Sequence, residues 1–293
     1  MIATTGFFDG VHLGHRLVIE RLVSLAHERG DESLVVTFWP HPRAVLQDGA
    51  RELRLLTTLE EKKALLSGLG VSRIEVLDFS RSFAALSAEE YLREVLRDRF
   101  GVTTLLVGYD NRLGSDRLTA GALAPVAVRL GIELIELEPF GMDAQPSQTH
   151  ISSTVIRNAL GRGDIESATS MLGYGYSLKG VVVAGNRLGR TIGFPTANMK
   201  LYEPLKLVPG RGVYVVEAEV LGQKYRGMTN IGLRPTVGGT STTIETHILD
   251  FDEDIYGLPL HITFLRRLRD EIHFPSLDAL KAQLEMDREA CRT

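Results

Sequence analysis

The sequence predicts two domains: a doubly wound α/β domain with a parallel sheet, then a small antiparallel β-barrel with a terminal helix. Strand and helix signals alternate over the first half of the chain, which is typical of βαβ units. Beyond Tyr174 apolar residues recur at every second position and glycine turns separate the segments, which is typical of a barrel. The length of 293 residues also favours two domains, each able to bury its own core. We place the boundary between residues 173 and 174.

Composition indicates a soluble globular protein and excludes several classes. Hydrophobic residues make up 44% of the chain and charged residues 24%, which is ordinary for folded domains. The formal net charge of -4 argues against nonspecific nucleic-acid binding, so bound phosphates should belong to small molecules. Cys291 is the only cysteine, which excludes an internal disulfide and a cysteine metal cluster. No apolar run is long enough for a membrane span and no secretory signal opens the chain, so we expect a cytoplasmic protein without membrane contact.

The chain opens with a predicted strand, Ile2 to Thr5, followed by GFFDGVHLGHR over residues 6–16. Gly6 and Gly10 predict a tight loop. Apolar residues at helical spacing follow and stop at Gly30, which suits a left-handed residue after a helix. We therefore predict a strand, a glycine loop and a helix in succession.

His12 and His15 stand where this helix begins, and their spacing of three places them on one face. Gly14 between them leaves room for a ligand. Free N–H groups and the helix dipole attract phosphate at such a terminus, and two imidazoles add hydrogen bonds. A single histidine here would more often be a cap or a surface residue. The pair favours a phosphate site.

Further strands and helices complete the predicted α/β domain. The predicted strands are residues 33–39, 74–77, 103–108 and 132–137; the helices start at capping boxes Thr58/Glu61 and Ser87/Glu90 and end at Leu66 and Leu96, with a third over residues 118–130. Ligands of a parallel sheet bind beyond the carboxyl ends of its strands. We therefore expect His12, His41 and Gly108 to converge there.

The segment ISSTVIR (151–157) suggests a second phosphate site. Ser152, Ser153 and Thr154 are suited to capping the helix that follows. Their hydroxyl and N–H groups, with Arg157 one turn on, are also suited to binding phosphate. Together with the histidine pair they would hold a triphosphate from two sides.

A short helix that Asp164 begins and Gly173 ends precedes the predicted barrel. The predicted barrel strands are residues 178–184, 212–220, 224–231, 242–251 and 260–266, with a hairpin at residues 221–223. Leu277, Leu280 and Leu284 define an amphipathic terminal helix. Five or six antiparallel strands with a covering helix fit a small closed barrel.

The stretch GNRLGRTIGFPTAN (185–198) contains three glycines that packing does not explain. We predict that Gly185, Gly189 and Gly193 take positive φ and let the backbone approach a ligand, with N–H groups aimed at anionic oxygens. The alternative is a glycine-rich hairpin between two strands.

Pro195 fixes the turn at the end of this stretch, and Thr196 and Asn198 then face one side of an extended chain. A hydroxyl and an amide oxygen so placed suit Mg²⁺, which prefers oxygen ligands and shares them with substrate phosphates and water. We therefore predict that these two residues hold a magnesium ion.

Several blocks together resemble a known enzyme family. The second half is similar to riboflavin kinases in GRTIGFPTAN (189–198), TNIGLRPT (229–236), IETHILDFDEDIYG (244–257) and FLRRLRDEIHFPSLDALKAQLEMD (264–287). The HLGH sequence resembles the HxGH motif of nucleotidyltransferases related to class I aminoacyl-tRNA synthetases, with their HUP-like fold, and GFFDG is typical of the flavin-adenylating branch. Both halves resemble the bacterial bifunctional riboflavin kinase/FAD synthetases.

The resemblance implies two reactions. The second domain would phosphorylate riboflavin to FMN, and the first would join FMN to the α-phosphorus of ATP, giving FAD and pyrophosphate. Mg²⁺ and ATP would serve both reactions, and no covalent enzyme intermediate is needed. The oligomeric state does not follow from the sequence, and a transient homo-oligomer stays open.

The resemblance also implies roles for individual residues. His12 and His15 would be catalytic in the first domain, where Gly6, Phe8, Asp9, Gly14, Ser152, Ser153, Thr154 and Arg157 would bind ATP. Gly185, Gly189, Arg190, Gly193 and Pro195 would bind ATP in the second domain, Thr196 and Asn198 would bind the metal, and Asp110, Asn230 and Arg269 would contact flavin.

Glu245 would accept the proton of the ribityl hydroxyl as that hydroxyl attacks the γ-phosphate. Thr243, Glu245, His247 and Leu249 share one face of a predicted strand. A lone carboxylate in such a strand is otherwise a solvated surface charge. His247 either orients its neighbours or is a packed strand histidine.

Two alternatives follow from departures from the family pattern. Phe7 stands where the family commonly has asparagine, and Asn111 and Leu113 stand where it has aromatic residues. The chain could therefore be a riboflavin kinase with a degenerate nucleotide-binding module. It could also be a non-catalytic flavin-binding protein or a flavin oxidoreductase. We favour the bifunctional enzyme because each half carries separate motifs in family order.

Overall fold

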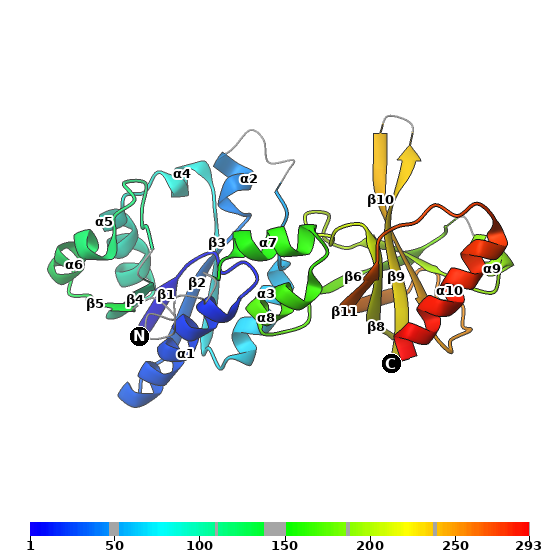
Figure 1. Cartoon of the computed structure of the whole chain (residues 1–293). Coiled ribbons are helices and arrows are strands. Elements are labelled where there is room, and N and C mark those ends of the chain that lie inside the picture. Colours follow the sequence, from blue (N-terminus) through cyan, green and yellow to red (C-terminus); the bar gives the residue numbers. More distant parts are fainter. Residues whose placement is uncertain (47–52, 109–110, 138–150, 186–187, 237–238, 293) are drawn as a thin grey trace, which may run out of the picture. The chain divides into compact units, whose positions relative to one another are not determined.

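The computed structural model covers the whole chain, and the structure describes all residues except 47–52, 109–110, 138–150, 186–187, 237–238 and 293 (Figure 1). The chain forms two compact units, Met1–Ser153 and Thr154–Thr293. Each unit has its own sheet, which confirms the predicted α/β domain followed by an antiparallel barrel. The predicted division of the two activities at residues 173 and 174 stays a prediction.

The first unit is built on a five-stranded sheet in the order β3-β2-β1-β4-β5, in which every pairing is parallel. Its strands are β1 (Ile2–Thr5), β2 (Ser33–Trp39), β3 (Arg73–Asp78), β4 (Thr104–Gly108) and β5 (Glu133–Leu137). Its helices are α1 (Leu13–Arg29), α2 (Pro42–Leu46), α3 (Leu59–Gly68), α4 (Arg81–Ala84), α5 (Ala88–Glu90), the π-helix η2 (Tyr91–Arg99) and α6 (Ala120–Arg129). Each predicted strand is correct to within one residue.

Alternate residues of the strands face two hydrophobic cores, one on each side of the sheet. Ile2, Val35 and Leu106 pack with Leu22 of α1 and Leu66 of α3. Ala3, Leu34 and Leu105 pack with Leu92 of η2 and Leu123 of α6. Helices therefore cover both faces, and the ends of the strands are the places left for ligands.

Two predicted helices of this unit need correction. The third begins at Ala120 with Thr119 as its cap, not at residue 118, because the backbone of Leu118 pairs with that of Leu113. The Ser87/Glu90 capping box is confirmed, but the helix continues to Arg99 and is a π-helix from Tyr91 onward. The Thr58/Glu61 box and the left-handed Gly30 are confirmed as well.

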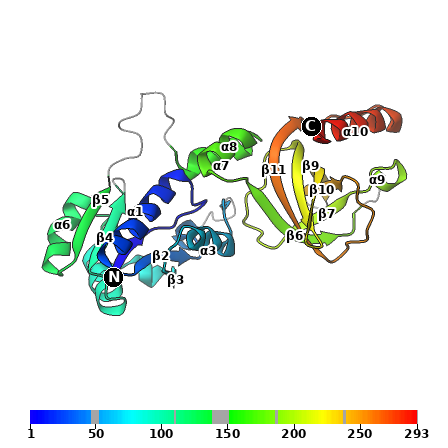
Figure 2. The same ribbon diagram turned by 90° about the horizontal axis from the view of Figure 1, so that it is seen from below.

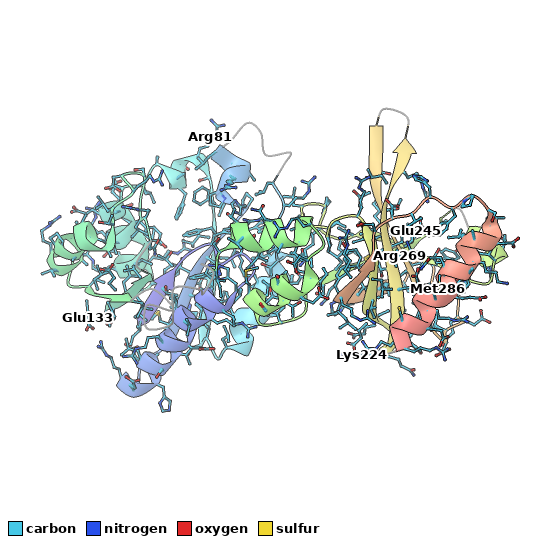
Figure 3. The ribbon with its side chains drawn as sticks, in the orientation of Figure 1. Arg81, Glu133, Lys224, Glu245, Arg269 and Met286 are labelled. Atoms are coloured by element: carbon cyan, nitrogen blue, oxygen red, sulfur yellow. The ribbon has the colours of Figure 1, made fainter. Side chains whose placement is uncertain are left out.

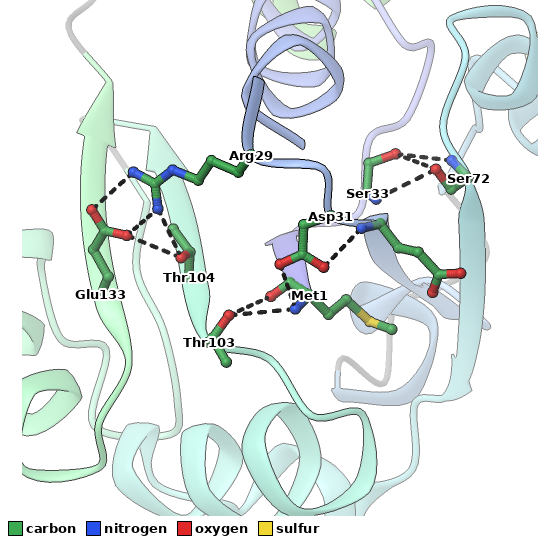
Figure 4. Close-up of polar contacts among 9 residues, drawn as sticks. Met1, Arg29, Asp31, Ser33, Ser72, Thr103, Thr104 and Glu133 are labelled. Carbon is green, nitrogen blue, oxygen red and sulfur yellow. Dashed lines mark hydrogen bonds and ion pairs between the residues drawn. The ribbon is translucent and has the colours of Figure 1, made fainter. Parts of the chain in front are cut away.

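Polar side chains join the amino ends of the strands (Figure 4). The ammonium group of Met1 lies 2.8 Å from a carboxylate oxygen of Asp31. Arg29 forms an ion pair with Glu133, and the hydroxyl of Thr104 donates to the same carboxylate at 3.0 Å. The Arg29–Glu133 pair is exposed, and pairs of this kind contribute about 1 kcal/mol or less. These contacts lie at the edge of the sheet opposite to the carboxyl ends.

The second unit contains a closed barrel in the order β10-β7-β6-β11-β8-β9, with antiparallel pairings throughout. Its elements are α7 (Ser153–Gly161), which begins at the unit boundary, α8 (Ile165–Leu172), β6 (Ser177–Val183), α9 (Leu188–Thr191), β7 (Ala197–Leu201), β8 (Gly212–Val220), β9 (Gln223–Thr236), β10 (Gly239–Ile248), β11 (Pro259–Arg269) and α10 (Leu277–Arg292). The sequence did not predict β7, and β10 lies about three residues earlier than expected.

Turns and helices of this unit are close to expectation. Leu221 and Gly222 form the predicted hairpin, with φ of 53° and 75°. Asp164 caps α8 and Gly173 ends it with φ of 75°. The terminal helix α10 lies along the outside of the barrel and contacts β9 (Figures 1 and 2). Leu277 is 53% exposed, so the expected apolar face of α10 begins only at Leu280, which lines a cavity together with Leu284.

Candidate functional site

The histidine pair of the first unit lies at the carboxyl edge of the sheet, as predicted. His12 caps α1, and its Nδ1 accepts a hydrogen bond from the N–H of His15 at 3.4 Å. The two imidazoles stack with their centroids 3.6 Å apart. A Cβ at Gly14 would lie 3.3 Å from the ring of His12, so glycine keeps the stacked pair free of crowding.

Burial keeps the imidazole of His15 neutral near pH 7. Burial lowers the pKa of His15 well below its ordinary value, and the nearby His12 and Lys62 lower this pKa further. Among the described residues the buried Nδ1 of His15 has no hydrogen-bond partner. A neutral imidazole beside free N–H groups at a helix start suits a phosphate oxygen.

The loop that leads to the histidines, residues 6–11, has an unusual backbone. Phe8 and Val11 have positive φ, at 50° and 37°, and Gly10 has φ of 83°. A non-glycine residue in this region is strained and persists only where its surroundings hold it. A Cβ at Gly6 would lie 2.9 Å from the ring of Phe8, so the loop also needs glycine there.

Asp9 anchors this loop. Its buried carboxylate accepts hydrogen bonds from the N–H groups of Leu56 and Thr57, each at 3.0 Å. The carboxylate thus holds the loop to the protein backbone, and the predicted role of Asp9 in binding ATP stays a prediction. The hydroxyl of Ser153 donates to the carbonyl of Asp9 at 2.9 Å, so one residue of the predicted second phosphate site lies against the loop.

The other residues of the predicted second phosphate site, in the segment 151–157, are divided between the two compact units. Ser152 belongs to the first unit, whereas Thr154 and Arg157 belong to the second, on α7. The predicted grip on a triphosphate from two sides stays a prediction.

An aromatic cavity of about 290 Å³ opens at the carboxyl ends of β1 and β2. Its lining includes Thr5, Gly6, Phe7, Phe38, Pro42, Phe79, Phe83, Ala84, Leu86, Tyr91, Asn111, Arg112, Leu113 and Gly114. We call it the aromatic cavity. Sequence reasoning missed it, although the aromatic residues clustered between positions 79 and 91 were a signal. Asp110, a predicted flavin contact, lies outside the described residues.

Phe7 and His41 meet at one wall of this cavity. Their ring centroids lie 4.0 Å apart in an edge-to-face arrangement. His41 follows β2 and Gly108 ends β4, on either side of β1, so residues 12, 41 and 108 lie at the carboxyl edge of the sheet, as expected.

In the barrel, the glycine stretch folds back on itself between β6 and β7 and contains α9. Of its three glycines, Gly193 has positive φ, at 85°, while the prediction of positive φ at Gly185 and Gly189 is wrong. A Cβ at Gly185 would lie 2.2 Å from the side chain of Asn198, and one at Gly189 would lie 2.2 Å from the carbonyl oxygen of Phe194. These two glycines permit close packing of the loop.

Two cavities adjoin this stretch. The glycine-loop cavity, of about 410 Å³, is lined by Val182, Gly185, Arg190, Pro195, Thr196, Ala197, Asn198, Thr246, Ile248, Phe251, Asp252, Glu253, Asp254, Ile255 and Tyr256. The helix-covered cavity, of about 330 Å³, is lined by Gly189, Ile192, Phe194, Thr196, Val213, Met228, Asn230, Glu245, His247, Arg269, Glu271, Ile272, Phe274, Leu280 and Leu284. Thr196 lines both.

Glu245 occupies the centre of the strands between these cavities. On β10 it pairs with Asn198 of β7 on one side and with Asn230 of β9 on the other. A carboxylate oxygen lies 3.3 Å from a guanidinium nitrogen of Arg234. Neighbours on β10 alternate, since Glu245 and His247 line the helix-covered cavity and residues 246 and 248 line the other.

His247 contacts the turn that carries the predicted metal ligands. Its Nδ1 lies 2.8 Å from the carbonyl oxygen of Pro195, and its ring meets that of Phe194 edge to face. Burial lowers the pKa of His247, against the opposing effect of the Pro195 hydrogen bond. The imidazole of His247 therefore packs against Phe194 and is also able to orient the turn at Pro195.

Arg269 lines the helix-covered cavity, and Figure 3 shows it on the barrel next to α10. Its guanidinium forms a bidentate ion pair with the buried Asp287 of α10, with contacts of 2.6 and 3.1 Å. Such a pair is geometrically specific. It ties β11 to the helix that covers the cavity.

The predicted metal ligands fit a magnesium ion in their chemistry. Among the described residues no group of three His, Cys, Asp or Glu side chains is placed to hold a metal. Thr196 and Asn198 supply oxygen atoms on the wall of one cavity. Mg²⁺ takes oxygen ligands and completes its shell with phosphates and water, so a sparse protein set is what it requires.

Both halves of the chain are similar to known protein families. A family profile described as FAD synthetase matches residues 1–155, and one described as riboflavin kinase matches residues 172–293. The bifunctional riboflavin kinase/FMN adenylyltransferase of Haemophilus influenzae is 38% identical over 99% of this chain and 92% of its own length. That of Escherichia coli K12 is also 38% identical, over 99% and 91%.

A solved structure extends the comparison to the fold. A crystal structure from Streptococcus pneumoniae, described as a macrolide-efflux protein, superimposes with a TM-score of 0.91 and 34% identity. The match covers 100% of this chain and 93% of that one. In the part of the chain that the structure describes, no helix has the length and apolar character needed to cross a membrane.

Proposed function

The chain belongs to the family of bifunctional riboflavin kinase/FMN adenylyltransferases, and on that premise we propose how its residues divide the two reactions. The protein phosphorylates riboflavin to FMN with ATP and adenylylates FMN to FAD. We assign the adenylyltransferase to residues 1–173 and the kinase to residues 174–293. A cytoplasmic location, the absence of nucleic-acid and membrane partners, and transient self-association stay predictions.

In the kinase, ATP occupies the glycine-loop cavity and riboflavin occupies the helix-covered cavity. The observation that carries this assignment is that Thr196 lines both cavities, so the γ-phosphate and the ribityl hydroxyl meet beside it. Gly185, Arg190 and Pro195 line the nucleotide side. The apolar side chains of Ile272, Phe274 and Leu284 face a flat ring system on the other side.

Thr196 and Asn198 hold Mg²⁺ against the phosphates. When bound, the ion neutralises negative charge on the transferred phosphoryl group. The carbonyl of Pro195, held by His247, fixes the turn that presents both ligands. The packed glycines keep the loop close to Asn198.

Glu245 accepts the proton of the ribityl hydroxyl. Its carboxylate lines the acceptor cavity one strand away from Asn198, close to the predicted metal and phosphate. Arg234 contacts this carboxylate and orients it. Asn230, on the other neighbouring strand, and Arg269 at the rim are placed to contact flavin or its new phosphate.

In the adenylyltransferase, the isoalloxazine ring of FMN enters the aromatic cavity and ATP lies over the start of α1. Phe7, Phe38 and Phe79 offer the apolar walls that a flat ring system requires. His12 and His15 donate hydrogen bonds to phosphate oxygens as charge builds up on them. Positioning and charge stabilisation of this kind are sufficient for transfer to a phosphate nucleophile.

One experiment tests the whole scheme: riboflavin, ATP and Mg²⁺ are incubated with the full chain, and FMN and FAD are separated over time. We expect FMN to appear first and FAD to follow. A protein that accumulates FMN without FAD, even when FMN is supplied, would be a kinase alone. A protein that retains a yellow cofactor without making ADP would be a flavin-binding protein.

Thr196→Ala and Asn198→Ala are expected to raise the Mg²⁺ and ATP concentrations needed for half-maximal FMN formation. An interaction with a charged group contributes about 1.5 to 3 kcal/mol, which corresponds to a rise of about ten- to a hundredfold. Initial rates over a series of Mg²⁺ concentrations measure this rise.

The matched controls are Thr242→Ala on β10 and Lys200→Ala on β7, two exposed residues outside both barrel cavities. Both controls should keep wild-type kinetics, and FAD formation from supplied FMN should be unchanged in all four variants. If the Mg²⁺ dependence is unchanged in Thr196→Ala and Asn198→Ala, residues 194–198 form a structural turn and do not bind the metal.

A further inference from the structure

Lys62 is a buried cation on α3 that neither reaction scheme uses. Its side chain is 1% exposed. Its ammonium group donates to the carbonyl of Phe7 at 3.0 Å, the hydroxyl of Thr37 at 3.0 Å and the carbonyl of Phe38 at 3.4 Å. It also lies 4.2 Å from the centroid of the Phe7 ring. These contacts join the loop after β1 to the carboxyl end of β2.

The groups that Lys62 joins belong to the adenylyltransferase site. Phe7 and Phe38 both line the aromatic cavity. Phe7 also belongs to the strained loop of residues 6–11 that leads to His12, and Asp9 holds the middle of that loop through the backbone of residues 56–57. Lys62 thus secures one end of a loop whose other end carries the histidine pair.

Nearby negative charge balances the positive charge of Lys62 only in part. Burial lowers its pKa to about 8, and the negative charge of Asp9 opposes this only in part. From α1, His15 also faces this charge, which lowers the pKa of the imidazole. Thr37 and Phe38 of β2 offer neutral oxygen atoms. An apolar side chain would avoid the cost of burying an ammonium group, so stability alone does not explain a lysine at this position.

We propose that Lys62 is a positioning residue for FMN adenylylation, whose ammonium group holds Phe7 and the histidine loop in the reactive arrangement. The proposal rests on the proposed function of the HLGH segment. Three hydrogen-bond acceptors match the three hydrogens of an ammonium group, and the ring of Phe7 adds a cation–π contact. A neutral amine has two hydrogens and no charge, so deprotonation weakens this hold.

Deprotonation of Lys62 has opposite effects on activity and on stability. In the folded protein the proton leaves as the pH rises through about 8. An unfolded lysine keeps its proton to about pH 10.4, so between these values the unfolded chain binds more protons and stability rises with pH. A loss of FAD synthesis in this interval would therefore not reflect unfolding that is linked to Lys62.

The test follows kcat/KM for FMN adenylylation and for riboflavin phosphorylation against pH in the same full-length protein. We expect adenylylation to fall about tenfold per unit above pH 8, and phosphorylation to lack this fall. Lys62→Met should adenylylate FMN about a hundredfold more slowly at pH 7, with no further alkaline fall, because small displacements of reacting groups cost rates of this size. Lys62→Arg keeps its charge at all these pH values and should remove the alkaline fall.

The matched control is Lys63→Met, whose side chain is 44% exposed on the same helix. Lys63→Met should have the same kcat/KM for FMN adenylylation as the wild type at every pH. A wild-type profile without the selective fall, or wild-type kcat/KM in Lys62→Met, would overturn the proposal. Should Lys62→Met not fold, the wild-type profile decides alone. If His12→Ala makes FAD at the wild-type rate, the proposed function of the HLGH segment fails, which no outcome with Lys62 can imitate.

Discussion

Glu245→Gln is expected to lower kcat for riboflavin phosphorylation by about a hundred- to ten-thousandfold, the usual contribution of a positioned general base. Glutamine keeps the shape of the side chain and most of its hydrogen bonds but has no basic carboxylate. In a loose phosphoryl-transfer transition state the proton moves late, so the loss should lie near the lower end of this range. Riboflavin and ATP should still bind, and FAD formation from supplied FMN should continue.

Glu285→Gln is the matched control for this variant, because Glu285 is an exposed carboxylate on α10 outside both barrel cavities. It should phosphorylate riboflavin like the wild type. Single-turnover rates at saturating substrates give the comparison. If Glu245→Gln keeps the wild-type kcat, the base is His247 or a bound water instead.

His12→Ala and His15→Ala are each expected to lower FAD formation by about a hundred- to a thousandfold, the typical loss for one preorganised donor to a charged transition state. The rings stack on each other, so removal of either one also releases the other. The double variant should therefore be only slightly worse than either single one, since groups that act as a unit are not additive.

Riboflavin phosphorylation is the internal standard for these variants, because the histidines and the barrel belong to different compact units. His27→Ala, an exposed histidine near the end of α1, is the matched control and should make FAD normally. Rates of FAD synthesis from supplied FMN are compared with rates of FMN synthesis in each variant. An equal loss of both activities would mean that the two reactions do not have separate sites.

The sequence predicted strands well where their signals are local. β2 and β8 are runs of apolar or alternating residues, and their bounds match expectation. β7 was missed because Pro195 and the preceding glycines indicate a turn, while its partners β6 and β10 supply the pairing from elsewhere in the chain. The π-helix η2 was missed because its apolar spacing also fits an α-helix, and packing decides between the two.

The site residues that the sequence predicts have local signals, whereas the missed ones depend on contacts with distant segments of the chain. His12 and His15 could be found because a helix start places near neighbours together. The aromatic cavity draws its walls from β2, α4 and η2, and each aromatic residue alone is typical of a core. Lys62 meets Phe7 across 55 positions of sequence, and a lysine on a helix normally indicates a solvated face.

Gly185 and Gly189 illustrate a different limit. Glycine was expected for its freedom in φ, and the structure requires it for the absence of a side chain. Sequence shows that a glycine is present, whereas the reason for it depends on atoms brought in by folding, here the side chain of Asn198 and the carbonyl of Phe194.

The alternation along β10 has a consequence for redesigning the kinase. Residues 246 and 248 face the cavity assigned to the phosphate donor, and residues 245 and 247 face the cavity assigned to the acceptor. Under this assignment, alternate residues of β10 determine the preference for the phosphate donor and the preference for the acceptor. A library that randomises Thr246 and Ile248 would search for enzymes that accept other nucleoside triphosphates, while the surface offered to riboflavin stays as it is.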